Sequence, residues 1–588
     1  MKKGLLILFC AALVTSAQAQ WSKTIETPTK TSFATTSSAI AVAPSGETFV
    51  AGSLSKDDVR FGNTTLNFEN TGDSFLFKYS STGEPVWANV INGESTHISA
   101  ITFDNEGNIY VAGTYQGETA TVFNGQENTK ETATCNFYED VFFGETIYFQ
   151  AGFIAKYSSD GKLVKLSTFK ADTNEAPETA FYYDRQVTFS IQNLQYANGK
   201  LYASAIYGGK TEKDGFSFEG KLFGSDMASD VTSGCVIAVN TNDLTIDAKL
   251  ADLSPNLTEN ANSLYSVTDV KTYVNANHVY AIFQAMAEMT LTVGSTTDNI
   301  SIPTEPTADD VLYSRAYILA DVNTNGTLNQ KMVYASIPEE AKDFQNTIGA
   351  IAEKDGKIIV TGLFNEYLPF KSSLACSGKF DFYAATINPT DLSVVSAQQG
   401  NIATPTMDPA KKEYITVYPT GAAISSNKIY ATVDYGFSTR NAEDKVVTTY
   451  SSYAITYDFN TVQADQQATN VYTNGVGVCD NKVVTATINI TNREFDEGDL
   501  IVTQTVDGES SIDNAVADKV AVKAYPNPVS DILNFSEACD VTIVNGQGSE
   551  VKSVSATTQI SVADLAAGYY IAKIKTADGT TVIPFIKK

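Results

Sequence analysis

Residues suited to acid–base chemistry or metal binding are scarce in this chain. It contains two histidines, His97 and His278, which lie far apart in the sequence. The sequence therefore offers too few histidines for a zinc site built on a histidine cluster, and it gives little support for Ser-His-Asp catalysis. Carboxylates are plentiful, yet no pair is set apart by its spacing as an acid–base couple. We therefore assign no catalytic residue, and we expect neither a metal nor a cofactor.

One segment resembles a calcium-binding loop. It reads DVNTNGTLN and offers oxygen donors at Asp321, Asn323, Asn325 and Asn329. Such loops place a glutamate at position twelve, where this segment has Met332. The segment also aligns with two tight turns elsewhere in the chain, KYSSTGEP and KYSSDGKL. A turn is therefore the favoured interpretation, and a metal site is the alternative.

The best candidate for ligand binding is a short aromatic and charged segment, FYYDRQ. No other part of the chain resembles this segment, which contains Tyr182, Tyr183, Asp184 and Arg185. It lies in a long connection, and functional residues tend to occupy such loops on a rigid scaffold. The competing interpretation is that these side chains only pack against the scaffold.

Composition and charge limit the possible classes of protein. The chain has 588 residues, which exceeds the ~100–200 residues of one domain and suggests several domains or a repeat. Hydrophobic residues make up 43% and charged residues 18%, as in a globular protein. Acidic residues number 67 against 40 basic residues, giving a net charge of -27. Because phosphate backbones repel such a chain, nucleic-acid binding is excluded.

The N-terminus predicts export. Lys2 and Lys3 precede an apolar run over residues 5–14, and Ala17-Gln18-Ala19 follows. This is the order of a secretory signal peptide, and we expect cleavage after Ala19. The run is shorter than the ~20 residues of a membrane-spanning helix, and no later stretch is long and apolar enough to be one.

The cysteines that remain after the expected cleavage do not show the spacing of a disulfide framework or a metal site. Their number is odd and their spacing wide, at Cys135, Cys235, Cys376, Cys479 and Cys539. Buried free thiols are the favoured interpretation, although one pair could form a disulfide.

A pair of β-hairpins recurs along most of the chain. The first hairpin is typified by DNEGNIYVAGTY, over residues 104–115, and the second by FIAKYSSDGKLVKLSTF, which starts at Phe153. Seven units of two hairpins can be aligned, each about 70 residues long. Seven units of four antiparallel strands predict a β-propeller. A β-solenoid is the alternative, although its repeats are usually much shorter.

A propeller usually completes its last blade with a strand from the other end of the chain. WSKTI, which begins at Trp21, resembles VWANV, which begins at Val86 in an outermost strand. We therefore expect residues 21–26 to complete the last blade. The alternative is a frayed N-terminus.

The repeats resemble a known family. DNEGNIYVAGTY and GDSFLFKYSSTGEPVW are similar to bacterial β-propeller repeats of the SBBP type. Units one and two match well, and the other units match loosely. The resemblance implies a propeller fold and says almost nothing about a ligand.

The repeat and the acidic character both end near Ala517. Residues 518–588 contain seven acidic and seven basic residues, and their short alternating strands predict a small β-sandwich. This segment resembles the C-terminal sorting domain of the type IX (Por) secretion system. The matching residues include Pro526, Asn527, Pro528, Gly568 and Tyr570. The resemblance implies that type IX export machinery is a partner, that the domain is removed, and that the protein is released or anchored at the surface.

These observations predict an all-β protein with three parts: a signal peptide (1–19), a propeller of about seven blades (20–517) and a C-terminal sorting-type sandwich (518–588). The expected location is extracellular, either secreted or on the outer-membrane surface. The favoured function is non-catalytic binding of a glycan or protein, because no catalytic constellation is recognisable. The alternatives are an extracellular polysaccharide hydrolase or lyase, and a structural or assembly role. Ligand binding is expected on the face of the propeller that carries the long connections.

Overall fold

The computed structural model describes most of the chain and divides it into two compact units, Met1–Glu509 and Ser510–Lys588. The described residues are 18–25, 39–53, 59–66, 68, 70, 72–140, 145–171, 188–208, 216–218, 221–223, 232–255, 267–286, 288–302, 304–306, 311–313, 315–336, 346–365, 367–376, 380–401, 414–425, 428–440, 446–458, 461–469, 471–492, 497–506, 524–525, 528–545, 550–576 and 579–588.

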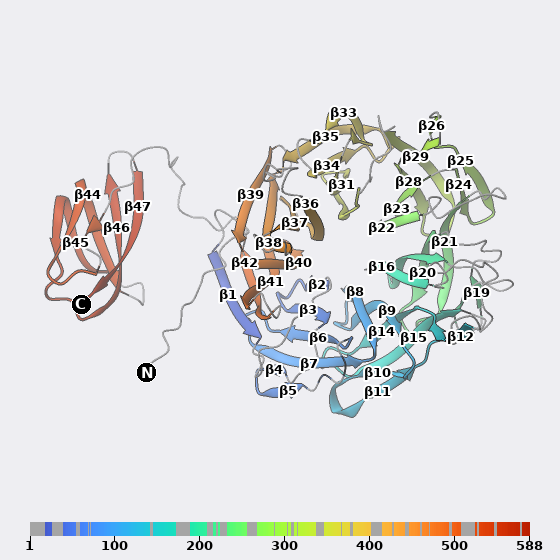
Figure 1. The fold of residues 1–588 in the computed structure, drawn as a ribbon, viewed down its shortest axis with the longest axis horizontal. Coiled ribbons are helices and arrows are strands. Elements are labelled where there is room, and N and C mark those ends of the chain that lie inside the picture. Colours follow the sequence, from blue (N-terminus) through green and yellow to red (C-terminus); the bar gives the residue numbers. More distant parts are fainter. Residues whose placement is uncertain are drawn as a thin grey trace. The chain divides into compact units, whose positions relative to one another are not determined.

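The first unit is a β-propeller (Figure 1). Its described residues include seven sheets that each contain a run of four antiparallel strands, and these sheets form the blades. The innermost strand of each blade contacts the innermost strand of the next, in the order β2, β8, β16, β22, β30, β36, β40 and back to β2. The blades therefore form a closed ring, which leaves few exposed sheet edges.

The blades are numbered in chain order, and their strands are given from the inside outward. Blade 1 comprises β2 (Ala39–Val42), β3 (Thr48–Ser53), β6 (Ser74–Tyr79) and β7 (Pro85–Asn92), and blade 2 comprises β8 (Ser95–Phe103), β9 (Ile109–Gln116), β14 (Ala151–Tyr157) and β15 (Leu163–Ala171). Blade 3 comprises β16 (Thr188–Ala197), β17 (Lys200–Gly208), β20 (Thr232–Asn240) and β21 (Ile246–Pro255), and blade 4 comprises β22 (Val267–Asn275), β23 (His278–Met286), β28 (Arg315–Asn323) and β29 (Leu328–Ser336).

Blades 5 to 7 follow the same order. Blade 5 comprises β30 (Ala350–Lys354), β31 (Lys357–Phe364), β34 (Asp381–Ile387) and β35 (Val394–Asn401). Blade 6 comprises β36 (Tyr414–Ile424), β37 (Lys428–Arg440), β38 (Val446–Asp458) and β39 (Thr461–Thr469). Blade 7 comprises β40 (Val471–Cys479), β41 (Lys482–Asn492), β42 (Glu497–Val506) and β1 (Gln18–Ile25).

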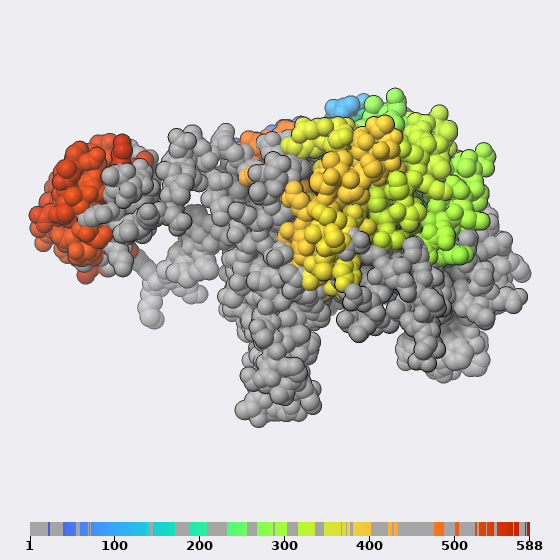
Figure 2. All heavy atoms as spheres, turned by 90° about the horizontal axis from the view of Figure 1, so that it is seen from above, coloured from blue at the N-terminus to red at the C-terminus, as the bar shows by residue number. Residues whose placement is uncertain are grey.

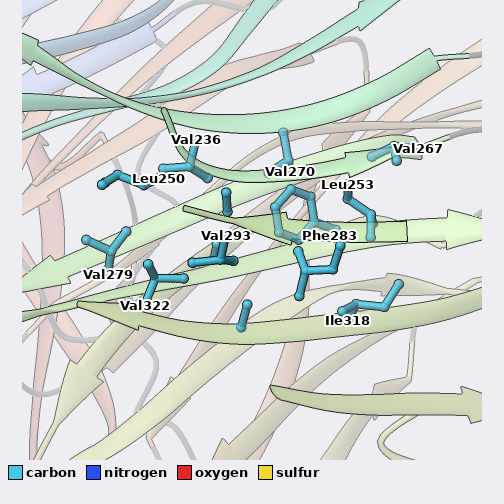
Figure 3. Close-up of a cluster of buried hydrophobic side chains, with 14 of the residues drawn as sticks. Val236, Leu250, Leu253, Val267, Val270, Val279, Phe283, Val293, Ile318 and Val322 are labelled. Carbon is cyan, nitrogen blue, oxygen red and sulfur yellow. The ribbon is translucent and has the colours of Figure 1, made fainter. Parts of the chain in front are cut away.

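Burial explains why the middle strands read as continuous apolar runs. In β3 every residue is buried, and in β9 every residue except the last. Such strands are covered on both faces by neighbouring blades, so neither face needs polar residues. Figure 3 shows one of these layers, in which Val236 of blade 3 packs near Val270 and Phe283 of blade 4. Burial of such side chains contributes roughly 1.5–3 kcal/mol each.

The N-terminal strand completes the last blade, as the sequence predicted. β1 pairs antiparallel with β42, so Trp21 lies beside Gln504. The Trp21 indole Nε1 donates to Gln504 Oε1 at 3.0 Å, and its ring stacks on Tyr79 of blade 1 with 5.4 Å between centroids. Trp21 is buried. The closing strand is therefore anchored to both blades that it joins.

The similarity between WSKTI and VWANV has a structural basis. Trp21 packs against Gly83, in the outer turn of the next blade, and Trp87 packs in the same way against Gly161. Both glycines have positive φ, and a Cβ atom on either would lie within 3 Å of the indole ring. A tryptophan on the outermost strand thus meets a glycine turn of the following blade at two of the junctions.

Three blades are extended by hairpins that the following blade donates. The hairpin β10–β11 pairs with β7, β18–β19 with β15, and β24–β25 with β21. Their bounds are β10 (Thr121–Asn124), β11 (Lys130–Ala133), β18 (Phe216–Phe218), β19 (Lys221–Phe223), β24 (Met289–Val293) and β25 (Thr296–Ile300). Each donated hairpin covers an outer edge that would otherwise expose unpaired backbone groups.

The two faces of the ring differ in their connections. Strand direction alternates, so the turns within the two hairpins of each blade lie on one face, the turn face. The connections between the hairpins start from the other face, the insertion face. They contain the donated hairpins, the short helix η1 (Gln126–Asn128), and the strands β4 (Val59–Phe61), β5 (Thr64–Leu66), β12 (Phe137–Asp140), β13 (Glu145–Tyr148), β26 (Thr304–Pro306), β27 (Val311–Tyr313), β32 (Tyr367–Leu368) and β33 (Lys371–Ala375).

The described residues of the second unit form a small β domain of five strands. They are β43 (Ala524–Tyr525), β44 (Ile532–Asn545), β45 (Glu550–Ser561), β46 (Gly568–Thr576) and β47 (Gly579–Lys587). β44 pairs with β43, β45 and β46, and its register shifts at several points. Its core contains Leu533, Val541, Ile543, Ala572 and Ile574. This unit has an apolar core of its own.

Candidate functional site: the junction between blades 4 and 5

The recurring motifs mainly hold the ring together. In DNEGNIY, Asp104 accepts hydrogen bonds from the backbone of Glu106 and Asn108, from the Asn108 amide and from the Tyr110 hydroxyl. Gly107 completes this turn at a φ of 81°. Burial acts to raise the pKa of Asp104, but these hydrogen bonds outweigh it, so the pKa is lowered. The motif is a turn-forming device.

A lysine on the third strand connects neighbouring blades. In blade 1, Lys78 lies over the Phe49 ring and donates to the Ser159 carbonyl of blade 2 at 3.1 Å. In blade 2, Lys156 lies over the Tyr110 ring and donates to the Thr241 carbonyl of blade 3 at 3.0 Å. These are the lysines of the FLFKY and FIAKY strands, so that motif marks a contact between blades.

Blade 4 carries an aspartate at the position of this lysine, and blades 3, 5, 6 and 7 also lack the lysine. Register places Asp321 opposite Tyr280, as Lys156 is placed opposite Tyr110. The Asp321 side chain is 2% exposed, and its Oδ1 lies 2.8 Å from Nδ1 of His278, whose side chain is 41% exposed. A buried carboxylate and a half-exposed imidazole thus replace the connecting lysine.

Amide groups complete the surroundings of Asp321. Asn329 donates to Oδ1 at 3.2 Å and Gln330 to Oδ2 at 3.4 Å. Gln330 also donates to the Pro389 carbonyl of blade 5 at 2.6 Å, and so provides the contact that a lysine provides elsewhere. A buried carboxylate needs such partners, because an unpaired one would cost several kcal/mol.

Further ionisable groups lie beside this pair. The His278 ring stacks on Tyr280 at 5.6 Å and 5°. Burial, and then the charges of Asp321 and Glu353, raise the pKa of Tyr280 to about 12. Burial and Glu353 also raise the pKa of Tyr273. Glu353, on the innermost strand of blade 5, accepts a hydrogen bond from the Asn275 amide. The group therefore spans the junction between blades 4 and 5 at the turn face.

The pairing defines what His278 can do. A carboxylate only accepts hydrogen bonds, so Nδ1 of His278 carries the hydrogen directed at Asp321. Nε2 then presents a lone pair in the neutral ring, or a second N–H in the charged ring. His278 can therefore accept a proton or a hydrogen bond at a position fixed by Asp321 and Tyr280.

The loop that resembled a calcium site forms a tight turn. Gly326 N donates to the Asn323 carbonyl at 2.8 Å, and the Asn323 amide donates to Asn329 Oδ1 at 2.6 Å. Gly326 has a φ of 82°. Within the described ranges, no three His, Cys, Asp or Glu side chains are grouped so that they could hold a metal ion.

The residues predicted to bind ligand, Tyr182, Tyr183, Asp184 and Arg185, lie outside the described residues. The His278–Asp321 pair was not predicted from the sequence. The available signal was an aspartate at the lysine position of the third strand, together with one of only two histidines in the chain. The two residues are 43 positions apart, so only the register of β23 and β28 brings them together.

The predicted sorting motif is described in part. Tyr570 is buried and its hydroxyl donates to the Ala566 carbonyl at 3.0 Å, while Gly568 begins β46. Pro528 is exposed, and Pro526 and Asn527 lie outside the described residues. The five cysteines among the described residues are thiols that form no disulfide, and Cys235 and Cys539 are buried. Among the described residues, no helix has the length and hydropathy needed to cross a membrane.

Solved structures resemble this chain only distantly. The polysaccharide lyase Uly1 has a TM-score of 0.38 and 10% identity, over 82% of this chain and 93% of that chain. The Bombyx mori GH32 β-fructofuranosidase BmSUC1 has a TM-score of 0.27 and 9% identity, over 82% and 92%. At such scores these similarities carry no argument about activity. A search of curated protein sequences found no match.

A family model does match the second unit. Residues 523–588 match the secretion system C-terminal sorting domain, which agrees with the domain expected from the sequence. Type IX sorting domains direct a protein to the cell surface or the extracellular space. This protein therefore carries a C-terminal sorting domain of the secretion system family, and it is exported to the cell surface or the extracellular space.

Proposed function

We propose that this protein is an extracellular binding protein, whose propeller holds a glycan or a protein without chemical conversion. The sorting domain at residues 523–588 supports export, with the type IX machinery as a partner. We also retain the assignment of the blades to SBBP-like repeats and the division of the chain at residues 19 and 517.

The observation that carries the proposal is the His278–Asp321 pair at the junction between blades 4 and 5. Lys78 and Lys156 serve the scaffold, whereas His278 leaves an imidazole half-exposed above a buried carboxylate. Burying a carboxylate costs stability unless it is fully paired. Local features that do not serve the stability of the fold are expected at functional sites.

Charge narrows the class of ligand. The chain carries a net charge of -27, which repels polyanions at long range. A neutral glycan or a protein without strong acidic character is therefore favoured. Hydroxyl groups suit the polar groups at the junction, because a hydroxyl can donate to Glu353, accept from the Asn275 amide, and either donate to or accept from His278. Tyr182, Tyr183, Asp184 and Arg185 remain a second proposed contact region.

A binding screen with the mature chain tests this proposal. The wild type, His278→Ala and the double variant Tyr182→Ala/Tyr183→Ala would be applied to arrays of neutral and acidic glycans and to extracellular proteins. Lys130→Met changes an exposed lysine on β11 and serves as a matched control. We expect a ligand whose affinity falls at least tenfold in His278→Ala but not in Lys130→Met. A ligand bound equally by all variants would contradict the proposed site.

The alternative is an extracellular polysaccharide hydrolase or lyase, and the fixed geometry of His278 and Asp321 is the observation that favours it. An imidazole whose Nδ1 is held by a carboxylate presents Nε2 as a possible general base. Incubation with neutral and uronate-containing polysaccharides, followed by assays for new reducing ends and unsaturated products, tests it. Turnover that His278→Ala abolishes would replace the binding proposal with an enzymatic one.

A further inference from the structure

Two buried amide side chains at the junction between blades 4 and 5 have polar atoms without a hydrogen-bond partner. Gln284 is 1% exposed, and both its Nε2 and its Oε1 lack a partner. Asn346 is 5% exposed, and its Nδ2 lacks one. Buried polar groups in folded proteins are nearly always paired, with protein or with ordered water. An orphaned amide on each side of one junction therefore needs an explanation.

Gln284 faces blade 5. Side chains alternate along β23, and Tyr280 and Ile282, which share the parity of Gln284, pack in the hydrophobic cluster with residues of blade 5. Val279 and Phe283 have the opposite parity and pack against blade 3. Gln284 therefore points into the junction between blades 4 and 5, near the insertion face. The described parts of these two blades, green and yellow in Figure 2, lie side by side.

Asn346 approaches the same region from blade 5. Gln284 lies opposite Asp269 on one side and Tyr317 on the other. Asp269 accepts a hydrogen bond from the Ile348 backbone at 3.0 Å, and the Tyr317 hydroxyl lies 3.5 Å from the Thr347 carbonyl.

The parity of the chain also turns Asn346 toward Gln284. Thr347 N and Gly349 N pair with blade 5, so residues 346 and 348 share one side of this extended segment. Ile348 packs in the same cluster as Tyr280 and Ile282 of blade 4. The Asn346 side chain therefore points toward blade 4, where the neighbours of Gln284 lie.

The unpaired atoms define the chemistry of the missing partner. Asn365 N donates to Asn346 Oδ1 at 3.3 Å, which fixes the orientation of this amide and leaves its N–H₂ group free. The partner must therefore accept from Asn346, accept from Gln284 Nε2 and donate to Gln284 Oε1. A bare cation fails the first two requirements, whereas a hydroxyl group meets all three.

We propose that Gln284 and Asn346 bind a buried hydroxyl group that bridges blades 4 and 5. Its source is either an ordered water or a hydroxyl of a small polyol or sugar. A buried water typically makes about three hydrogen bonds to groups of this kind. The site is separate from His278, which lies at the opposite end of β23, so it does not depend on the ligand proposed above.

Thermal unfolding of the mature full chain provides the first test. Gln284→Met keeps the length of the side chain but removes both polar atoms. If a hydroxyl is bound, this change removes the hydrogen bonds that hold it and leaves the Asn346 amide without a partner. The melting temperature should therefore fall. Tyr157→Phe is the control, because the Tyr157 hydroxyl is also buried without a partner and lies in blade 2, away from this junction. We expect Tyr157→Phe to leave the melting temperature unchanged or raised.

If Gln284→Met raised the melting temperature, the proposal would be overturned. The Gln284 amide would then be a buried group without any partner in the wild type. A crystal structure of the wild type that shows ordered water is the second test. Density within hydrogen-bonding distance of Gln284 and Asn346 supports the site, and a dry junction contradicts it. Glucose and glycerol distinguish the sources: stabilisation of the wild type but not of Gln284→Met identifies a polyol hydroxyl, and equal effects with density present identify water.

Discussion

Lysines that lie between blades are single residues that connect one blade to the next. Lys156 combines a charge-assisted hydrogen bond to the Thr241 carbonyl with a contact to the Tyr110 ring at 5.4 Å. Lys156→Met keeps much of the side-chain volume but loses both interactions, so we expect unfolding to become easier by about 1–3 kcal/mol. Urea denaturation measures this. Lys130→Met, at an exposed position, should change stability by less than about 0.5 kcal/mol. Equal effects would show that the inter-blade contact contributes nothing.

Asp104 should make stability depend on pH in the acid range. Its pKa in the folded protein lies below the ordinary value of 3.8, so its ionised form stabilises the fold. This contribution is fully present above the unfolded pKa and is lost as the pH falls through the folded pKa. The stability difference between the wild type and Asp104→Asn should therefore shrink as the pH falls below about 4. Urea midpoints across this range measure it, with the exposed Glu131→Gln as control. A constant difference would contradict the assignment.

For single residues, the sequence predicted the turns but not the contacts between residues of different blades. The motifs around Asp104 and Lys156 were visible as repeats, because each recurs in a similar local context. Their inter-blade partners were not, since Thr241 lies 85 positions from Lys156. His278 and Asp321 were dismissed for the same reason, as spacing along the chain says nothing about cross-strand neighbours. The candidate site was therefore predicted only as a tight turn.

Among the elements, the N-terminal strand has the most testable role. Trp21→Ala removes the hydrogen bond to Gln504, the stacking on Tyr79 and the packing on Gly83. Loss of a buried tryptophan typically costs about 3–5 kcal/mol, and here it also weakens ring closure. Lys23→Ala, on the same strand, removes only the solvent-exposed ion pair with Glu84, which is worth less than about 1 kcal/mol. Chemical denaturation of both variants measures the difference.

A fall of similar size in Trp21→Ala and Lys23→Ala would mean that the strand contributes through its backbone alone. This strand was predictable because WSKTI copies the pattern of VWANV. The donated hairpins were not predicted from the sequence. Pairing of β10 with β7 joins different repeat units, and it depends on how the blades lie beside one another. Long connections were expected to cover the insertion face, but these three extend sheets at the outer edge.

At the scale of the whole molecule, the two units should be separable. They have separate cores, and nearly all of the net negative charge lies in the first. We expect a chain ending at Ala517 to retain the thermal transition of the propeller but to remain inside the cell envelope of a host with type IX export. Calorimetry and cell fractionation measure the two outcomes. An insoluble truncated chain, or one exported at the normal level, would contradict the proposed division.

Closure of the ring by β1 also sets an order of events. The two partners in the Trp21–Gln504 hydrogen bond are 483 positions apart, so the first strand to be made is among the last to find its partner. Closing so long a loop is entropically costly and makes folding slow. A chain that stops before β42 can neither close its ring nor carry the sorting domain that follows. Completion of synthesis is thus a shared requirement for circular assembly and for departure from the cell.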